Sequence, residues 1–253
     1  MTAPGTPAVR DAGAGDRKGP GDGTPRMCVL HTVAALPAVF DPLLREEAPG
    51  VRPYHMVDES LLADTIAYGP LPRTTARLAS HIAQAEAAGA RAVLVTCSSI
   101  GPAAEQARAL VDIPVLRVDA PMAAEAIRTG PRIGVLATLS STLEPTAELI
   151  RRQAADAGAR IELTTSTCEG AYRARTEGRP EEHDALIAAE ARRLAAGHDV
   201  LVLAQASMAA ALRSPGADGG ELGVPVLTSP RSGTAQLAAL ASPPPDGHGT
   251  ART

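Results

Sequence analysis

The residues best suited to chemistry are a thiol and two hydroxyls that follow an apolar run. Residues 91–102 read Arg-Ala-Val-Leu-Val-Thr-Cys-Ser-Ser-Ile-Gly-Pro. The apolar run is typical of a buried parallel strand, and Pro102 is typical of the first turn of a helix. Ligands of open α/β sheets bind at the carboxyl ends of strands, and a nearby helix start lowers the pKa of a thiol. Cys97 is therefore a candidate acid/base or nucleophile, and a buried structural cysteine is the alternative interpretation.

A similar segment occurs a second time in the chain. Residues 87–99 align without gaps to residues 195–207, and each copy is followed by a matching strand, Ile-Pro-Val-Leu in the first and Val-Pro-Val-Leu in the second. This pattern predicts an internal duplication of a helix–strand–loop–helix–strand unit. In that duplication Gln205 is the symmetry mate of Cys97, so one copy carries a thiol and the other an amide.

The composition favours an α/β protein and disfavours several classes of function. Hydrophobic residues make up 45% of the 253 residues, but aromatic residues only 2%, so the core must consist of Ala, Val, Leu and Ile. The formal charge is −4 without a basic cluster, which argues against nucleic-acid binding. No apolar run approaches the roughly 20 residues that span a membrane, and we expect no membrane partner. The absence of a signal-like stretch, with three unpaired cysteines, predicts a cytoplasmic protein.

The order of predicted elements divides the chain into two Rossmann-like α/β domains. We expect a first domain at residues 26–130, a second at 131–229, and a C-terminal helix at 230–241 that packs back on the first. Tails 1–25 and 242–253 are rich in Gly and Pro, and we expect them to be disordered. Each domain would hold a parallel sheet, and the loops at the strands' carboxyl ends would face an interdomain cleft.

The predicted cleft loops are rich in hydroxyls and helix starts, which suit a small carboxylate bound by backbone N–H groups. Helix capping is the alternative role for the serines and threonines. His31, at the end of the first strand, is a candidate second acid/base or a structural histidine. Cys168 lies in a loop, and we expect it at the surface or in a lid. Tyr172, in the same loop, is a candidate to close over a ligand, and packing in the core or at the surface is the alternative. No spacing typical of a phosphate loop or a zinc site is present. The candidate binding residues are Thr32, Ser98, Ser99, Thr138, Ser140, Ser141, Thr142, Gln205, Ala206 and Ser207.

Three motifs resemble the aspartate/glutamate racemase superfamily, which includes hydantoin racemases, maleate isomerases and arylmalonate decarboxylases. The motifs are Val-Thr-Cys-Ser-Ser at 95–99, Ile-Gly-Val-Leu-Ala-Thr at 133–138 with the hydroxyls at 140–142, and Ala-Gln-Ala-Ser at 204–207. The resemblance covers residues 27–241. It implies two pseudo-symmetric domains with four-stranded parallel sheets, no metal or organic cofactor, and a homodimer.

The resemblance also implies a cysteine from each domain beside the substrate's α-carbon. Cys97 matches the first family cysteine, whereas the second falls at Gln205. We therefore expect a cofactor-independent racemase or isomerase that moves a proton next to the carboxylate of a small acid, with Cys97 as acid/base or nucleophile. A single-cysteine decarboxylase of a malonate-like acid is one alternative. A catalytically inactive small-carboxylate binding protein is the other, because an amide cannot move the second proton.

Overall fold

The computed structural model describes residues 23–212 and 222–241. Of the two predicted tails, all but residues 23–25 lie outside these ranges. The strands of the described residues are β1 (Arg26–His31), β2 (Arg52–Val57), β3 (Val93–Val95), β4 (Val115–Arg117), β5 (Arg132–Ala137), β6 (Glu162–Thr167), β7 (Val200–Leu203) and β8 (Val226–Thr228).

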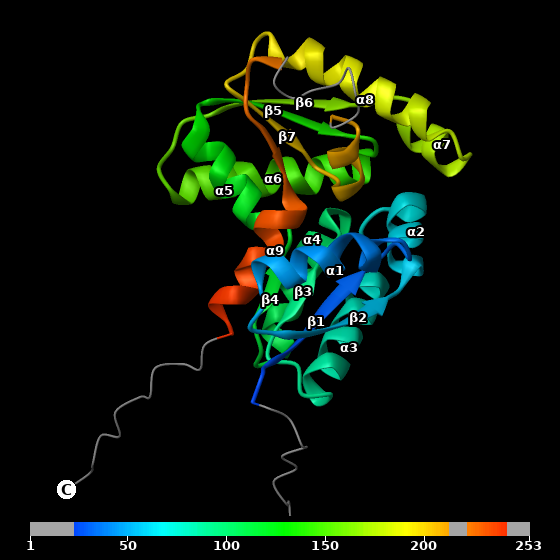
Figure 1. Ribbon diagram of the computed structural model, residues 1–253, viewed down its shortest axis with the longest axis vertical. Helices are drawn as coiled ribbons and strands as arrows, with labels where there is room; N and C mark the ends of the chain where they lie inside the picture. Colours follow the sequence, from blue (N-terminus) through cyan, green and yellow to red (C-terminus); the bar gives the residue numbers. More distant parts are fainter. Residues whose placement is uncertain (1–22, 213–221, 242–253) are drawn as a thin grey trace, which may run out of the picture.

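The strands form two four-stranded sheets in which every pairing is parallel. The first sheet has the order β2-β1-β3-β4, and the second repeats it as β6-β5-β7-β8. Figure 1 shows one sheet in each of two lobes. The expected α/β fold with two pseudo-symmetric parallel sheets is therefore confirmed, and the shared strand order agrees with the predicted duplication.

Helices connect the parallel strands, as such connections require. Proline stands at the first or second position of six of them, where its missing N–H costs no hydrogen bond. The helices are α1 (Leu36–Glu47), α2 (Glu59–Tyr68), α3 (Pro72–Ala87), α4 (Gly101–Ala107), α5 (Ala120–Thr129), α6 (Ser140–Asp156), α7 (Ala171–Thr176), α8 (Pro180–Ala195) and α9 (Ser229–Ala239), with 3₁₀ turns η1 (Ser98–Ile100), η2 (Arg108–Leu110) and η3 (Ala206–Ala210). No helix in the described part of the chain has the length and apolar character needed to cross a membrane.

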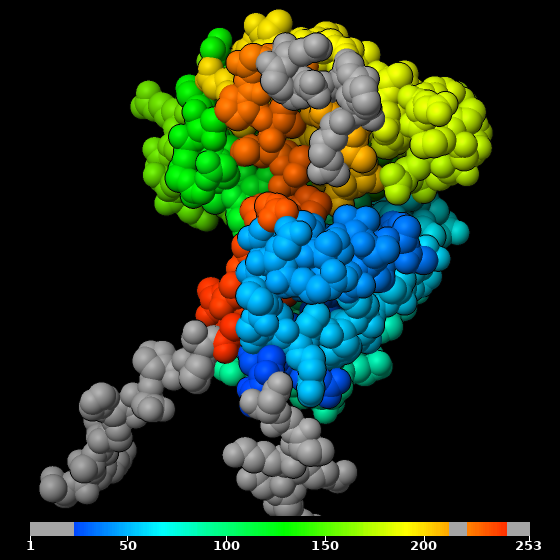
Figure 2. Space-filling view, viewed as in Figure 1, coloured from blue at the N-terminus to red at the C-terminus, as the bar shows by residue number. Residues whose placement is uncertain are grey.

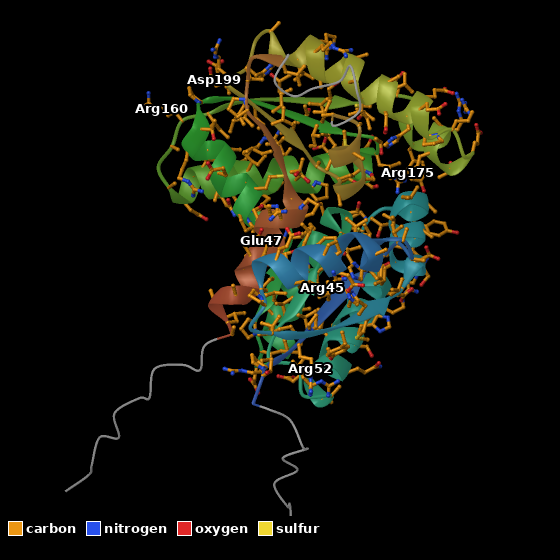
Figure 3. All side chains as sticks on the ribbon, viewed as in Figure 1. Arg45, Glu47, Arg52, Arg160, Arg175 and Asp199 are labelled. Carbon is orange, nitrogen blue, oxygen red and sulfur yellow. The ribbon has the colours of Figure 1, made fainter. Side chains whose placement is uncertain are left out.

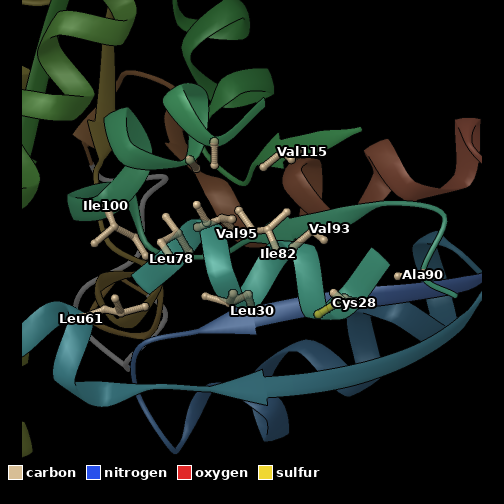
Figure 4. Packing of buried hydrophobic residues seen from close by; sticks show 14 residues of the cluster. Cys28, Leu30, Leu61, Leu78, Ile82, Ala90, Val93, Val95, Ile100 and Val115 are labelled. Atoms are coloured by element: carbon tan, nitrogen blue, oxygen red, sulfur yellow. The ribbon is translucent and has the colours of Figure 1, made fainter. Parts of the chain in front are cut away.

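Helices cover both faces of each sheet, so the strands are buried on both sides. In the first sheet, the α3 stripe of Leu78, Ile82 and Ala85 packs with β1 and β3 on one face (Figure 4), while α1 and α9 cover the other. In the second sheet, α8 covers one face, and α5 and α6 cover the other. This arrangement leaves the carboxyl ends of the strands free for a site.

The packing boundary between the halves differs from the predicted one. The helix α9 packs against α1, with Leu237 in the first core. However, α5, which we placed in the first domain at 26–130, buries Met122, Ala123 and Ala126 against β5 and β7. The chain passes from β4 into α5 almost at once, and α5 covers the face of the second sheet that α8 leaves open.

Candidate active site

A cavity of about 100 Å³ lies between the carboxyl ends of the two sheets. In the space-filling view the two halves meet along a broad front (Figure 2). The structure brings nine of the predicted residues to its wall: Thr32, Cys97, Ser98, Ser99, Thr138, Thr142, Gln205, Ala206 and Ser207.

Cys97 follows β3 and occupies the N-cap position of η1 with an extended backbone. Its side chain is half-buried. Burial raises the pKa of the Cys97 thiol, while hydrogen bonding by the Thr32 hydroxyl, by the backbone N–H groups of Ile100 and Ser99 and by the Ser99 hydroxyl acts in the opposite direction and is weaker in sum. The expected lowering of the thiol pKa by the helix start is thus outweighed by desolvation.

Thr32 directly follows β1 and lies beside Cys97. It is 2% exposed, and its Oγ1 has no hydrogen-bond partner of ordinary geometry among the described residues. A buried hydroxyl without a partner carries a free-energy cost, so this group is available to donate to a thiolate or to a bound ligand.

Gln205 is held in one orientation by Thr138. The backbone N–H of Thr138 donates to Gln205 Oε1 at 2.6 Å, and the Thr138 hydroxyl lies 2.9 Å from the same oxygen. Because a backbone N–H can only donate, the atom facing it must be the amide oxygen. The Gln205 amide therefore keeps its Nε2 donors for the cavity, and it offers hydrogen bonds but no titratable proton.

Two of the predicted serines also join the halves. Ser98 Oγ donates to the Ala204 carbonyl at 3.3 Å, and Ser99 Oγ lies 2.8 Å from Thr142 Oγ1. Each contact links the loop after β3 to the opposite half of the molecule. These serines thus help to hold the two walls of the cavity together.

Ser140 and Ser141 line a different cavity from the one that contains Cys97. Their cavity of about 530 Å³ also contacts Ser99, which has a place in both walls. The first turn of α6 directs these two residues away from Cys97, whereas Thr142, one residue later, lines the cavity beside Cys97. The structure therefore divides the predicted hydroxyl loop between two cavities.

The sequence interpretation missed Arg175, the only charged residue among the described residues that line the cavity. Arg175 lies on α7, where this short helix faces α2 (Figure 3). Tyr172, one turn earlier, lines the same cavity. The (i, i+3) spacing of an aromatic and a basic residue just after a sheet strand could have indicated this pair.

We expected Cys168 at the surface or in a lid, but the structure buries it. It is 3% exposed and packs in the core beneath α7 and α8, where burial raises its pKa to about 12.

His31 lies behind the cavity and does not line it. Its ring is 0% exposed, and both ring nitrogens are occupied: Nδ1 is 2.9 Å from Thr96 Oγ1, and Nε2 is 2.8 Å from His55 Nδ1. Burial lowers the pKa of His31 to about 4, with a smaller contribution from His55 in the same direction. The hydrogen bond of His31 to Thr96 connects its ring to a side chain of a residue that does line the cavity.

The fold and the cavity define an α/β protein with a cavity between two halves of the same strand order. A sequence model of the Asp/Glu/hydantoin racemase family matches residues 31–237, and the chain belongs to this family. The family and its solved members place the chain among the racemases, a class of isomerase. A comparison with curated proteins finds no match.

Solved racemases share the fold at low sequence identity. Glutamate racemase isoform RacE1 from Bacillus anthracis is 18% identical, with a TM-score of 0.64, over 85% of this chain and 81% of that one. Allantoin racemase from Klebsiella pneumoniae is 18% identical, with a TM-score of 0.60, over 85% and 87%. Picrophilus torridus aspartate racemase is 12% identical, with a TM-score of 0.65, over 86% and 94%.

Proposed function

We propose that this chain is a cofactor-independent racemase in which Cys97 moves a proton at the carbon next to a carboxylate of a small acid. The observation that carries this proposal is the position of the thiol. Cys97 lies at the wall of a cavity between two duplicated halves, with hydrogen-bond donors from Thr32 and Ser99 beside its sulfur.

The donors around the cavity suit the charge that develops during proton removal. Loss of the α-proton places negative charge on the carboxylate oxygens, and preorganised donors stabilise such charge in a water-poor site. The Nε2 donors of Gln205 and the hydroxyl of Thr32 are free for this role. The same hydroxyl favours the thiolate form of Cys97 once its proton has left.

Because Gln205 stands where a second cysteine would stand, the two faces of the substrate must exchange protons with different groups. An amide neither takes nor gives a proton near neutral pH, so Cys97 acts on one face and water acts on the other. Inversion then proceeds when the thiolate takes the α-proton and water protonates the opposite face. The thiol proton and the hydroxide that remain regenerate one water, so no co-reactant is consumed.

The charge of the cavity favours an anionic substrate. Arg175 is the only charged residue among its described lining, and no carboxylate accompanies it. A carboxylate gains a cationic partner at this wall, whereas an ammonium group gains no counter-charge. We therefore expect a small acid without a free ammonium group to bind better than a zwitterion.

A screen of amino, hydroxy, malonic and maleic acids in deuterated water, read by NMR, tests the proposal. We expect deuterium at the α-carbon with inversion for at least one acid, and a rate loss of at least about 100-fold in Cys97→Ala. Cys168→Ala, which removes a thiol away from the cavity, is the matched control. Full turnover by Cys97→Ala, carbon dioxide release, or binding without exchange would each overturn the proposal.

The assembly and the location of the protein are further proposals, of which the first follows the family resemblance and the second follows the composition of the sequence. We propose a homodimer, which sedimentation equilibrium would test, and a cytoplasmic location, which cell fractionation would test. A monomer at all concentrations, or recovery in the membrane fraction, would contradict them.

A further inference from the structure

A continuous line of hydrogen bonds leads from the surface to the cavity wall. Asp41 Oδ1 is 3.0 Å from His55 Nε2, His55 Nδ1 is 2.8 Å from His31 Nε2, and His31 Nδ1 is 2.9 Å from Thr96 Oγ1. The four residues come from α1, β2, β1 and the end of β3. All three distances are those of ordinary hydrogen bonds.

The line runs from solvent to the interior. The Asp41 side chain is 48% exposed and the His55 side chain 21%, whereas His31 is 0% and Thr96 5% exposed. Thr96 lines the cavity that contains Cys97. Phe40 packs against the His31 ring at 5.4 Å between centroids, and the two rings of His31 and His55 are stacked. One end of the line therefore meets water, and the other meets the ligand space.

Two complete hydrogen-bond arrangements fit this geometry, and they differ by one proton. In the first, the Thr96 hydroxyl donates to His31 Nδ1, His31 Nε2–H donates to His55, and His55 Nε2–H donates to Asp41. In the second, His55 Nδ1–H donates to His31 Nε2, and His31 Nδ1–H donates to Thr96 Oγ1. The Thr96 hydroxyl then donates to the Leu30 carbonyl at 3.1 Å. His55 is then an imidazolium that donates to both His31 and Asp41.

We propose that Asp41, His55 and His31 form a proton relay that takes up, through Thr96, the proton that Cys97 releases into the cavity. The inference rests on the proposed role of Cys97 as acid/base. It assigns relay roles to three residues that do not touch the substrate.

Each transfer in the relay conserves protons and charge. The thiol proton passes to a cavity water at Thr96, and the Thr96 hydroxyl passes its own proton to His31 Nδ1. His31 Nε2–H passes to His55 Nδ1, and the imidazolium of His55 is paired with the Asp41 carboxylate until water removes the proton. His31 is neutral before and after the transfer, as its burial beside Phe40 requires.

A racemase with a single catalytic thiol needs a path by which that thiol loses its proton after each inversion. Each inversion leaves a proton on Cys97, while the opposite face of the substrate takes its proton from water. Burial raises the pKa of the thiol, so the proton does not leave readily without an acceptor. His55 and Asp41 continue the line of hydrogen bonds beyond His31, so this pair is the acceptor that the fold supplies.

The rate of α-proton exchange in deuterated water, measured in dilute buffer on the acid that the screen identifies, tests the relay. We expect kcat to fall roughly five-fold in His55→Gln and in Asp41→Asn with KM unchanged, and added imidazole buffer to restore kcat, because an external base then takes up the proton. The rate of Cys97 alkylation by iodoacetamide should stay at the wild-type value, because a proton path does not change the thiolate fraction, and peptide mapping assigns the label, since Cys28 and Cys168 are buried. Both residues are partly exposed, so these variants avoid the cost of replacing the buried His31.

His81→Gln is the matched control, because His81 pairs with Asp58 at 2.8 Å with similar exposure but does not line the cavity. Its kcat should match the wild type. Equal kcat values for wild type, His55→Gln and Asp41→Asn would overturn the relay, and so would an equal loss in His81→Gln or a loss that imidazole does not restore. If the wild type exchanges the α-proton and Cys97→Ala does not, the proposed function stands and these outcomes test the relay alone; if no acid is exchanged, the proposed function fails and the relay fails with it.

Discussion

Gln205 occupies in the second sheet the register position that Cys97 occupies in the first. In each half the central strand pairs in parallel with the strand that precedes the key residue. Continued two residues beyond the last pairs, the register places Thr32 beside Cys97 and Thr138 beside Gln205. The contacts agree: Thr32 acts on the Cys97 pKa, and Thr138 bonds Gln205 Oε1. One architecture thus holds a thiol on one wall and an amide on the other.

Gln205→Glu separates the two roles of the amide. The carboxylate still accepts both bonds from Thr138, so we expect the free energy of unfolding to change by less than about 1 kcal/mol. It removes the Nε2 donors and places a negative charge in the cavity, so KM for an anionic acid should rise at least about 10-fold. Steady-state kinetics and urea unfolding check both outcomes, and an unchanged KM would remove Gln205 from the binding site.

Thr32→Val removes the hydroxyl beside the sulfur while keeping the shape of the side chain. Because Thr32 Oγ1 has no other partner, we expect stability to be unchanged or slightly higher. The pKa of Cys97 should rise further, since one of the groups that lower it is lost. Alkylation rates against pH measure this displacement. Thr32→Ser is the control and should retain the wild-type profile.

The Ser99–Thr142 bond predicts energetic coupling between the halves. Ser99→Ala or Thr142→Val each removes one partner of a buried 2.8 Å hydrogen bond, at a cost of about 1 kcal/mol. In the double variant the second change should cost less, because no partner remains unsatisfied. A double-mutant cycle by urea unfolding measures the coupling, and strictly additive effects would show that this bond contributes nothing.

His31 makes the protein sensitive to mild acid. Its pKa is about 4 when folded, against 6.5 ordinarily, so between these pH values only the unfolded chain binds the proton. The free energy of unfolding therefore falls as pH falls through this window, by about 2 kcal/mol from pH 7 to pH 5. Urea unfolding at pH 7, 6 and 5 checks the slope. His31→Gln should be less stable at pH 7 and should lose this part of the slope.

Arg175→Gln removes the single cation of the described cavity wall. For an anionic acid we expect KM to rise about 10-fold with little change in kcat, because the guanidinium binds ground state and transition state alike. Arg173→Gln, on the same helix but away from the cavity wall, is the control. An equal rise in KM for the two substitutions would show that the overall surface charge, and not a contact of Arg175 with the acid, changes binding.

The sequence predicted the sheets and the position of Cys97 because both depend on local pattern. Apolar strands, prolines at helix starts and the repeated segment can all be recognised in the sequence itself. In contrast, α2 was not predicted, although Asp58 caps it by accepting from the Ser60 N–H. The buried Arg117, which pairs with Asp119 and Glu105, also escaped prediction, because a charged residue ordinarily indicates the surface.

The parts of the site that sequence did not reveal depend on tertiary distance. No pattern in the sequence indicates that His55 and Asp41 lie beside His31, since the three residues come from separate elements. The direction in which the pKa of Cys97 is shifted could not be predicted from the sequence either, because desolvation depends on what packs around Cys97. Arg175 reaches the cavity only because α7 faces α2 in the folded chain.

The chain crosses between the two halves at two places that touch each other. One crossing follows β4 and the other enters α9, and at their contact a Cβ on Gly233 would meet the Val118 carbonyl at 2.4 Å. Two adjacent connections therefore tie the halves together along one edge of the molecule. At the opposite edge α7 faces α2, and Arg175, the cation of the described cavity wall, stands there.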